Sequence, residues 1–228
     1  MNKTELYKAF ENCGIAGEIA HSFEAKMEDY IKEIILYNSA YNLTNTSDHD
    51  ELMTRHILDS ISAFKKIKEL VEKKYTGAEQ NNYLYIADIG SGGGLPGIPL
   101  ATAFMLSESK IKFELVERME KRCSFLENCI AILGLKNVQV INSEAERIEP
   151  EKYDLITFRA FRPLDKKMTK TLLKIVKSEG FLCAYKARLE SIKEEMEQIK
   201  NLVPDYKIEN LNVPGLEDSE RNLVIIQK

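Results

Sequence analysis

Residues 83–100, YLYIADIGSGGGLPGIPL, decide the fold of this chain. The apolar run 83–89 is typical of a buried strand, and it carries one acid, Asp88, near its end. A loop rich in glycine follows, and then a small-residue segment that is predicted to be helical. Glycines let a ligand approach the backbone closely, and the start of a helix offers free N–H groups. The stretch therefore predicts the first strand, loop and helix of an α/β domain that binds a nucleoside or dinucleotide.

Strand-like runs alternate with helical patterns after this stretch, which predicts a mainly parallel sheet with crossover helices. The last two runs leave no room for a helix between them, so we expect them to pair antiparallel. The expected strands are 83–89, 111–116, 138–141, 153–158, 180–185, 206–213 and 221–227. A mainly parallel seven-stranded sheet that ends in an antiparallel hairpin is the Rossmann-like fold of methyltransferases that use S-adenosylmethionine (SAM).

Helical patterns fill the first part of the chain, to about residue 74. Apolar residues recur at helical spacing in 23–35 and in 53–64, and Ser47 and Asp48 are candidate N-caps of the second helix. We expect residues 1–74 to form a helical extension packed on a core formed by 75–228, with the polar segment 73–82 as the connector. Two more amphipathic helices are expected: 119–133, with Met119 on its apolar face and Gly134 as its end, and 188–200.

Composition narrows the class of protein. The chain has 228 residues, of which 44% are hydrophobic and 30% charged. It has no apolar run of membrane-spanning length, and residues 1–10, MNKTELYKAF, do not resemble the apolar region of a signal peptide. We therefore expect a cytoplasmic protein without membrane contact, and a monomer. The four cysteines are not spaced as a disulfide framework or a zinc site, so no metal is expected. The net charge of −4 argues weakly against nucleic-acid binding without excluding it.

Two nucleoside cofactors compete for the glycine loop. A dinucleotide fingerprint needs G-x-G-x-x-G, but Leu95 stands at the third glycine position and Asp88 would face the pyrophosphate unfavourably. SAM has no phosphate and carries positive charge, which suits a nearby acid. Glu117, at the end of the second strand, can accept hydrogen bonds from both ribose hydroxyls. The residues therefore favour SAM over NAD, and a plain strand–helix turn is the weaker alternative.

Several blocks in order resemble the small-subunit ribosomal RNA guanine-N7 methyltransferases, the RsmG or GidB family. The most specific is DIGSGGGLPGIPLA at 88–101; the others are NLT at 42–44, RHILDS at 55–60, KRCSFL at 121–126, RAF at 159–161 and YKA at 185–187. Together they extend from about residue 42 to the C-terminal end. Ala187 in place of the usual glycine, and Arg162-Pro163, depart from the family pattern and put only local loop geometry in doubt.

The resemblance implies SAM as the methyl donor, with contacts at Gly90, Leu95, Ala145, Glu146 and Arg159. The expected cofactor site therefore comprises Asp88, Gly90, Gly92, Leu95, Glu117, Ala145, Glu146 and Arg159. The resemblance also implies the substrate: a guanine, position 527, of 16S rRNA in the small ribosomal subunit or its precursor.

The residues agree with transfer to guanine N7, which has a free lone pair and needs no general base. No cysteine adjoins a proline, as transfer to pyrimidine C5 would require, and no Asp/Asn-Pro-Pro-aromatic motif for amine methylation follows the fourth strand. Candidate positioning residues are His56, Arg159 and Lys186, although His56 can equally be a structural histidine and each base an ordinary surface residue. Phe158 and Phe161 suit either base stacking or core packing.

Two other functions stay open. The chain could be a SAM-binding ribosome-assembly factor that transfers no methyl group, or a methyltransferase for a small molecule or a protein.

Overall fold

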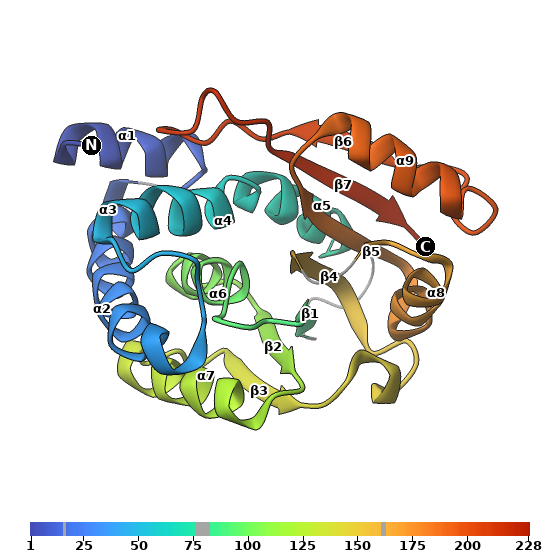
Figure 1. Ribbon diagram of the computed structural model, residues 1–228, viewed down its shortest axis with the longest axis horizontal. Coiled ribbons are helices and arrows are strands. Elements are labelled where there is room, and N and C mark those ends of the chain that lie inside the picture. Colours follow the sequence, from blue (N-terminus) through green and yellow to red (C-terminus); the bar gives the residue numbers. More distant parts are fainter. Residues whose placement is uncertain (16, 76–82, 161–162) are drawn as a thin grey trace.

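The computed structural model describes residues 1–15, 17–75, 83–160 and 163–228 (Figure 1). A seven-stranded sheet with the order β3-β2-β1-β4-β5-β7-β6 runs through its centre. Neighbours from β3 to β5 pair in parallel, whereas β7 is antiparallel to both β5 and β6. The strands are β1 (Leu84–Ile89), β2 (Ile111–Glu117), β3 (Val138–Asn142), β4 (Tyr153–Arg159), β5 (Val176–Lys186), β6 (Lys207–Asn210) and β7 (Asn222–Gln227). The parallel sheet and its terminal hairpin are confirmed.

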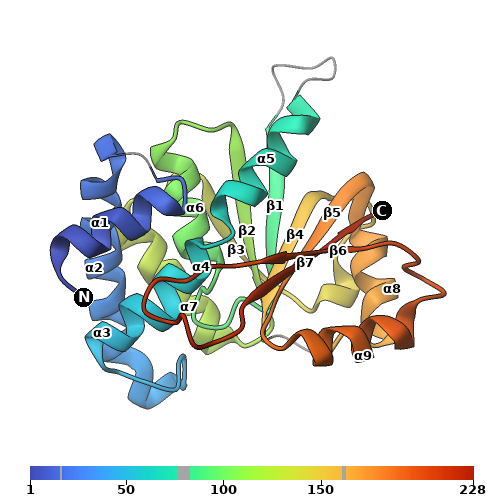
Figure 2. The ribbon, with the colours of Figure 1, turned by 90° about the horizontal axis from the view of Figure 1, so that it is seen from above.

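Helices cover both faces of the sheet, and Figure 2 shows the two helical layers on opposite sides of it. The N-terminal layer contains α1 (Lys3–Asn12), α2 (Gly17–Tyr41), α3 (His49–Leu52), the π-helix η1 (Met53–Leu58), α4 (Asp59–Ile61), α5 (Phe64–Tyr75), α6 (Gly97–Leu106) and α7 (Glu120–Leu133). The opposite layer contains the 3₁₀ turn η2 (Ala145–Arg147), α8 (Lys166–Ile175) and α9 (Leu189–Ile199). The helices expected in the first part of the chain and at 119–133 and 188–200 are confirmed.

Each helical layer encloses its own hydrophobic cluster against the sheet. The larger cluster includes fully buried Phe23, Met27 and Tyr30 of α2 together with Phe104 of α6 and Phe113 of β2. The N-terminal helices therefore share one core with α6, α7 and the sheet rather than forming a core of their own. The division of the chain near residue 74 stays a prediction, and positions 76–82 of the expected connector lie outside the described residues.

Local signals explain most element boundaries. Gly134 adopts a left-handed conformation (φ 61°) and ends α7, and the Asp48 side chain caps α3 by accepting from the Glu51 N–H. Met119 was placed on the buried face of α7, which is wrong: it is the N-cap residue and is 46% exposed. Strand β5 begins at Val176, four residues earlier than expected, because Val176 pairs with Tyr153 across a register shift.

All four cysteines are free and buried. None of the described helices combines the length and the hydropathy that crossing a bilayer requires. Within the described ranges, no group of three or more His, Cys, Asp or Glu side chains is arranged to hold a metal ion.

Candidate functional site

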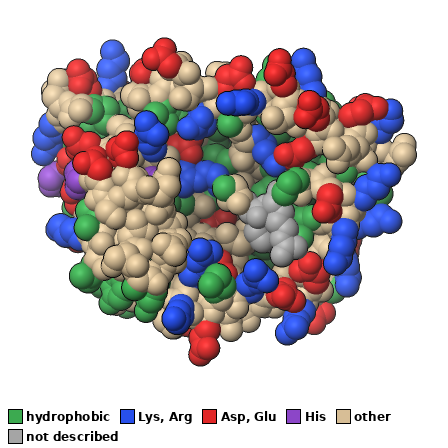
Figure 3. Space-filling view, viewed as in Figure 1, with side chains coloured by type: hydrophobic (Ala, Val, Ile, Leu, Met, Phe, Trp, Pro, Cys, Tyr) green, Lys and Arg blue, Asp and Glu red, His purple; other side chains and the backbone are tan. Residues whose placement is uncertain are grey.

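Two adjoining cavities lie at the carboxyl ends of the parallel strands. The larger has a volume of about 750 Å³ and the smaller about 190 Å³, and both are lined by Gly90, Arg122 and Ala160. Gly90 follows β1 and Ala160 follows β4, the two strands between which the strand order reverses. Open α/β sheets bind ligands at this switch point. Figure 3 shows the hollow in the middle of this face, with Lys and Arg side chains around it.

Asp88 lies beneath the glycine loop and organises it. Its Oδ2 accepts from the Ser91 hydroxyl at 2.7 Å and from the Gly97 N–H at 3.0 Å. A Cβ at Gly97 would lie 2.6 Å from that same oxygen and 2.5 Å from Leu115, so only glycine fits there. The N-terminus of α6 is therefore already occupied by a buried carboxylate. A cofactor pyrophosphate cannot take that position, which is the one a dinucleotide fold uses.

Burial dominates the electrostatics of Asp88. The residue is 1% exposed, and burial raises the pKa of its carboxyl to about 6, although the hydrogen bonds from Ser91 and Gly97 act in the opposite direction. Its Oδ1 has no hydrogen-bond partner among the described residues. Asp88 lines neither cavity, so the structure places it behind the wall of the site rather than in it.

The smaller cavity lies between the loops that follow β2 and β3. Its walls include Glu117, Ala145 and Glu146, which the sequence analysis expected at the cofactor. Glu117 is 4% exposed. Its carboxylate accepts from two backbone amides, the Gly92 N–H at 3.0 Å and the Met119 N–H at 2.8 Å. Each oxygen keeps one further lone pair, so the carboxylate is held in place and can still accept from a diol.

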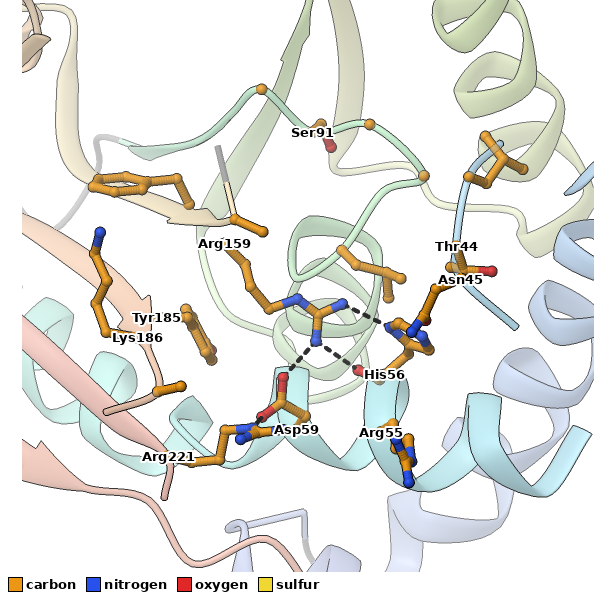
Figure 4. Close-up of a pocket in the computed structure, with 18 of the residues that line it drawn as sticks. Thr44, Asn45, Arg55, His56, Asp59, Ser91, Arg159, Tyr185, Lys186 and Arg221 are labelled. Carbon is orange, nitrogen blue, oxygen red and sulfur yellow. Dashed lines mark hydrogen bonds and ion pairs between the residues drawn. The ribbon is translucent and has the colours of Figure 1, made fainter. Parts of the chain in front are cut away.

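The larger cavity contains Arg159, at the end of β4, in contact with the helix that carries His56 and Asp59. Figure 4 shows the guanidinium between them. Nη1 donates to Asp59 Oδ2 at 2.5 Å and to the His56 carbonyl at 3.5 Å, and Nη2 lies 3.2 Å from His56 Nδ1. The second oxygen of Asp59 accepts from Arg221 Nε at 3.1 Å. Asp59 is 4% exposed and therefore forms a buried ion pair with two arginines.

His56 is neutral at physiological pH. Burial and the positive charge of Arg159 lower the pKa of its imidazole to about 4. Because the guanidinium donates to Nδ1, the ring proton belongs on Nε2. His56 is thus an oriented, uncharged ring in the cavity wall, and it does not serve as a proton-binding base here.

The backbone that presents these residues is irregular. Met53–Leu58 forms a π-helix, a conformation that occurs mostly as short segments at functional sites. The adjoining α4 is fastened to the sheet by Tyr185, whose hydroxyl donates to the Ser60 carbonyl at 2.5 Å. Helical spacing puts Arg55, His56, Asp59 and Ser60 on one side of a helix, but that spacing does not indicate the π-turn.

Leu43, Thr44 and Asn45, which follow α2, also line the larger cavity, and Figure 4 shows Thr44 and Asn45 on the side away from Tyr185 and Lys186. Asn38 shapes this segment: its Oδ1 accepts from the N–H groups of Leu43 and Thr44, both at 2.9 Å. Its Nδ2 donates to the Thr46 carbonyl at 3.0 Å and to the Ser47 hydroxyl at 2.9 Å. Ser47 is therefore a partner of Asn38, and Asp48 alone is the helix cap.

Lys186 lines the larger cavity but is already paired. Its Nζ lies 2.7 Å from Glu195 Oε2 of α9, and the same oxygen accepts from the Leu164 N–H. Phe158 is 2% exposed and belongs to the core cluster beneath α8 and α9, so it packs as a core residue. Phe161 lies outside the described residues, as does Arg162.

The structure brings nearly all the expected site residues to the two cavities. Gly90, Gly92, Leu95, His56, Arg159 and Lys186 line the larger one, and Gly90, Glu117, Ala145 and Glu146 line the smaller one. Further residues that line the larger cavity, and that were not among the expected site residues, include Arg122, Asp59, Tyr185 and Arg221. Three of them, Arg122, Asp59 and Tyr185, belong to the blocks that carried the resemblance, whereas Arg221 is preceded only by a turn and had no sequence signal.

Comparisons with known proteins agree with this geometry. The profile of the family described as rRNA small subunit methyltransferase G matches residues 23–224. The chain is 41% identical to ribosomal RNA small subunit methyltransferase G of Treponema denticola, covering 98% of this chain and 93% of that protein. It is 33% identical to the protein of the same name from Borrelia garinii, covering 99% of each.

Solved structures share the fold at low sequence identity. A SAM-dependent methyltransferase from Aquifex aeolicus superposes with a TM-score of 0.53 at 18% identity, covering 79% of this chain and 93% of that one. The DszA carbon methyltransferase gives a TM-score of 0.56 at 11% identity, covering 86% of this chain and 57% of that one. These similarities concern the fold alone.

Proposed function

Because this chain belongs to the rRNA small subunit methyltransferase G family, we propose that it methylates N7 of a guanine in 16S rRNA with SAM as the methyl donor. The observation that carries the proposal is the family match over residues 23–224, which spans every residue that lines the two cavities. SAM, when bound, supplies an electrophilic methyl group on its sulfonium.

The two cavities suit different parts of SAM: the smaller one suits the ribose, and the larger one suits the methionine portion. The Glu117 carboxylate, with its remaining lone pairs, would accept from the ribose hydroxyls in the smaller cavity. The Arg159 guanidinium, in the larger cavity, would bind the carboxylate of the methionine portion. Gly90 lines both cavities and would lie along the centre of the molecule. Asp88 would act indirectly, by holding the loop and the first residue of α6.

The larger cavity also suits an RNA substrate. Arg55, Arg122, Arg159, Lys186 and Arg221 all line it, so its walls are basic although the whole chain has a net charge of −4. Guanine N7 attacks through a free lone pair, so the site has only to hold the base in line with the methyl group. His56, neutral and oriented, and Arg159 would position groups at the site without accepting a proton.

The test is methyl transfer to small ribosomal subunits that lack the modification. With tritiated SAM, label is expected in 16S rRNA, and borohydride followed by aniline should then cleave the chain at the labelled guanine. Subunits that already carry the modification are the control and should take up no label. Label at another atom or in another molecule would contradict the N7 proposal. Binding of S-adenosylhomocysteine without any transfer would support an assembly factor instead.

A further inference from the structure

Arg159 is held by the protein in a way that leaves one particular edge of its guanidinium available. The group has five N–H donors, and the three contacts described above use only the two terminal nitrogens. Among the described residues, no hydrogen bond engages its Nε–H. Nε–H and one N–H of Nη2 lie side by side along the same edge of the planar group. Figure 4 shows this edge turned toward the glycine loop, while Asp59 and His56 occupy the opposite side.

Asp59 and His56 determine that orientation. The Asp59 carboxylate holds Nη1, and the imidazole holds Nη2 through Nδ1, so the plane of the guanidinium is defined by two contacts from one helix. Asp59 is in turn immobilised, because Arg221 donates to its other oxygen and the residue is 4% exposed. A guanidinium that is fixed in this way loses less conformational entropy on binding a ligand than a free arginine side chain does.

We propose that Asp59 is a positioning residue, which with His56 turns the Nε–Nη2 edge of Arg159 toward the α-carboxylate of SAM for bidentate binding. The inference rests on the proposed use of SAM and extends it to residues that do not contact the cofactor themselves. Two arginines share the single charge of Asp59, so the cluster keeps a positive charge that favours an anion. An Arg–carboxylate fork is the geometry that this edge offers.

The test compares two ligands that differ in the carboxylate. S-adenosylhomocysteine has the methionine-type α-carboxylate, whereas 5′-methylthioadenosine has the same nucleoside and sulfur but no amino acid. In Asp59→Asn, titration calorimetry should show affinity for S-adenosylhomocysteine lowered about tenfold to a hundredfold, as for loss of a charge-assisted hydrogen bond. Affinity for 5′-methylthioadenosine should be unchanged. A purely structural role would lower both affinities together.

Asp154→Asn is the matched control. Asp154 is also a buried aspartate, 5% exposed, that pairs with a base, Lys177 Nζ at 2.9 Å, but it lines neither cavity. It should leave both affinities as they are in the native chain. If Asp59→Asn alone does not fold, the double variant Asp59→Asn/Arg221→Gln removes one buried positive charge as well and carries the same comparison.

The outcomes separate this inference from the proposed function. Selective loss of S-adenosylhomocysteine binding supports the role of Asp59. Equal loss of both ligands, or no loss, overturns it while leaving the proposed function intact. A native chain that binds neither ligand contradicts the proposed function itself.

Discussion

At the scale of single residues, folding shifts the pKa values of two buried groups near the site in opposite directions. Asp88 holds its proton more tightly in the folded chain than in the unfolded one, whereas His56 holds its proton less tightly. Each therefore makes folding stability depend on pH, with opposite sign, in the weakly acidic range. Single substitutions can separate the two contributions.

The free energy of unfolding of the native chain should fall as the pH is raised from about 4 to about 6. In Asp88→Asn this fall should be smaller. The pKa of Asp88 is 3.8 when unfolded and about 6 when folded, so in this window the folded state binds more protons and stability decreases as pH rises. The difference corresponds to roughly 3 kcal/mol. The amide oxygen can still accept from Ser91 and Gly97, so the loop should persist.

Urea unfolding of the native chain and of the variant, followed from pH 4 to pH 7, measures this difference. The variant should gain relative stability as pH rises and reach a constant difference above pH 6. A difference between the two chains that does not vary with pH would contradict the assignment.

His56→Asn tests the opposite case. The pKa of His56 is 6.5 when unfolded and about 4 when folded, so between these values the unfolded state binds the proton and stability is lost as pH falls. The variant cannot take up that proton, while its side-chain oxygen can still accept from Arg159. Its free energy of unfolding should therefore decline less steeply than that of the native chain below pH 6.5. Urea unfolding of both chains from pH 4 to pH 7 measures this, and equal slopes in the native chain and His56→Asn would contradict the lowered pKa of His56.

Gly97→Ala should destabilise the chain, although alanine usually favours a helix. The new Cβ would lie 2.5 Å from Leu115 and 2.6 Å from Asp88, so the loop or β2 must move. Overpacking of this kind costs about 1–3 kcal/mol. The matched control is Gly17→Ala, also at the first residue of a helix, where nothing lies within 4 Å of the new Cβ and stability should rise slightly. Thermal unfolding of the two variants measures the contrast, and equal shifts would contradict it.

At the scale of elements, the site depends on segments that have little regular structure of their own. Asn38 makes four hydrogen bonds to the segment after α2, at Leu43, Thr44, Thr46 and Ser47, and Arg122 also donates to the Asn42 carbonyl. The π-helix is held by Arg159, which donates to the His56 carbonyl, and the adjoining α4 is held by Tyr185, which donates to the Ser60 carbonyl. Polar contacts with the rest of the molecule, rather than local propensity, therefore set the shape of the cavity walls on this side.

Asn38→Ala should loosen the segment that contains Thr44 and Asn45. Loss of both acceptor and donors leaves two backbone N–H groups without their partner, at a cost of about 1–3 kcal/mol for each that stays buried. Asn38→Asp keeps the acceptor for Leu43 and Thr44 and loses only the donors, so its effect should be smaller. Amide hydrogen exchange of residues 42–47 is the measurement. Equal protection in the native chain and Asn38→Ala would show that other contacts hold the segment.

At the scale of the whole molecule, the sequence predicted what local pattern determines. The glycine loop, the mainly parallel sheet and the terminal hairpin follow from periodicity and turn residues, and Glu117, expected at the site because it ends a strand, lines the smaller cavity. The cluster around Asp59 was not predicted, because its partners Arg159 and Arg221 lie 100 and 162 residues away. The direction of the Asp88 side chain was not predictable either. Its neighbours in sequence do not indicate whether the carboxylate faces the ligand or the start of α6.

The N-terminal helices and the sheet share one hydrophobic cluster, and this predicts a single cooperative unfolding transition. Met27, Tyr30 and Ile34 of α2 are fully buried in that cluster, and the Tyr37 ring contacts Phe125 of α7. An extension that formed its own core would unfold separately. Here its apolar faces are covered by α6 and α7, so neither part is expected to remain folded when the other unfolds.

Met27→Ala tests this coupling, because a fully buried methionine costs about 2–5 kcal/mol when truncated. The whole urea transition should shift to lower concentration, and far-UV circular dichroism and tyrosine fluorescence should report the same midpoint; the chain has no tryptophan. Met1→Ala, at a position that is 50% exposed, should leave the midpoint where it is. Two separate transitions in Met27→Ala, with the strands unfolding at the native midpoint, would mean that residues 1–74 form an independent folding unit.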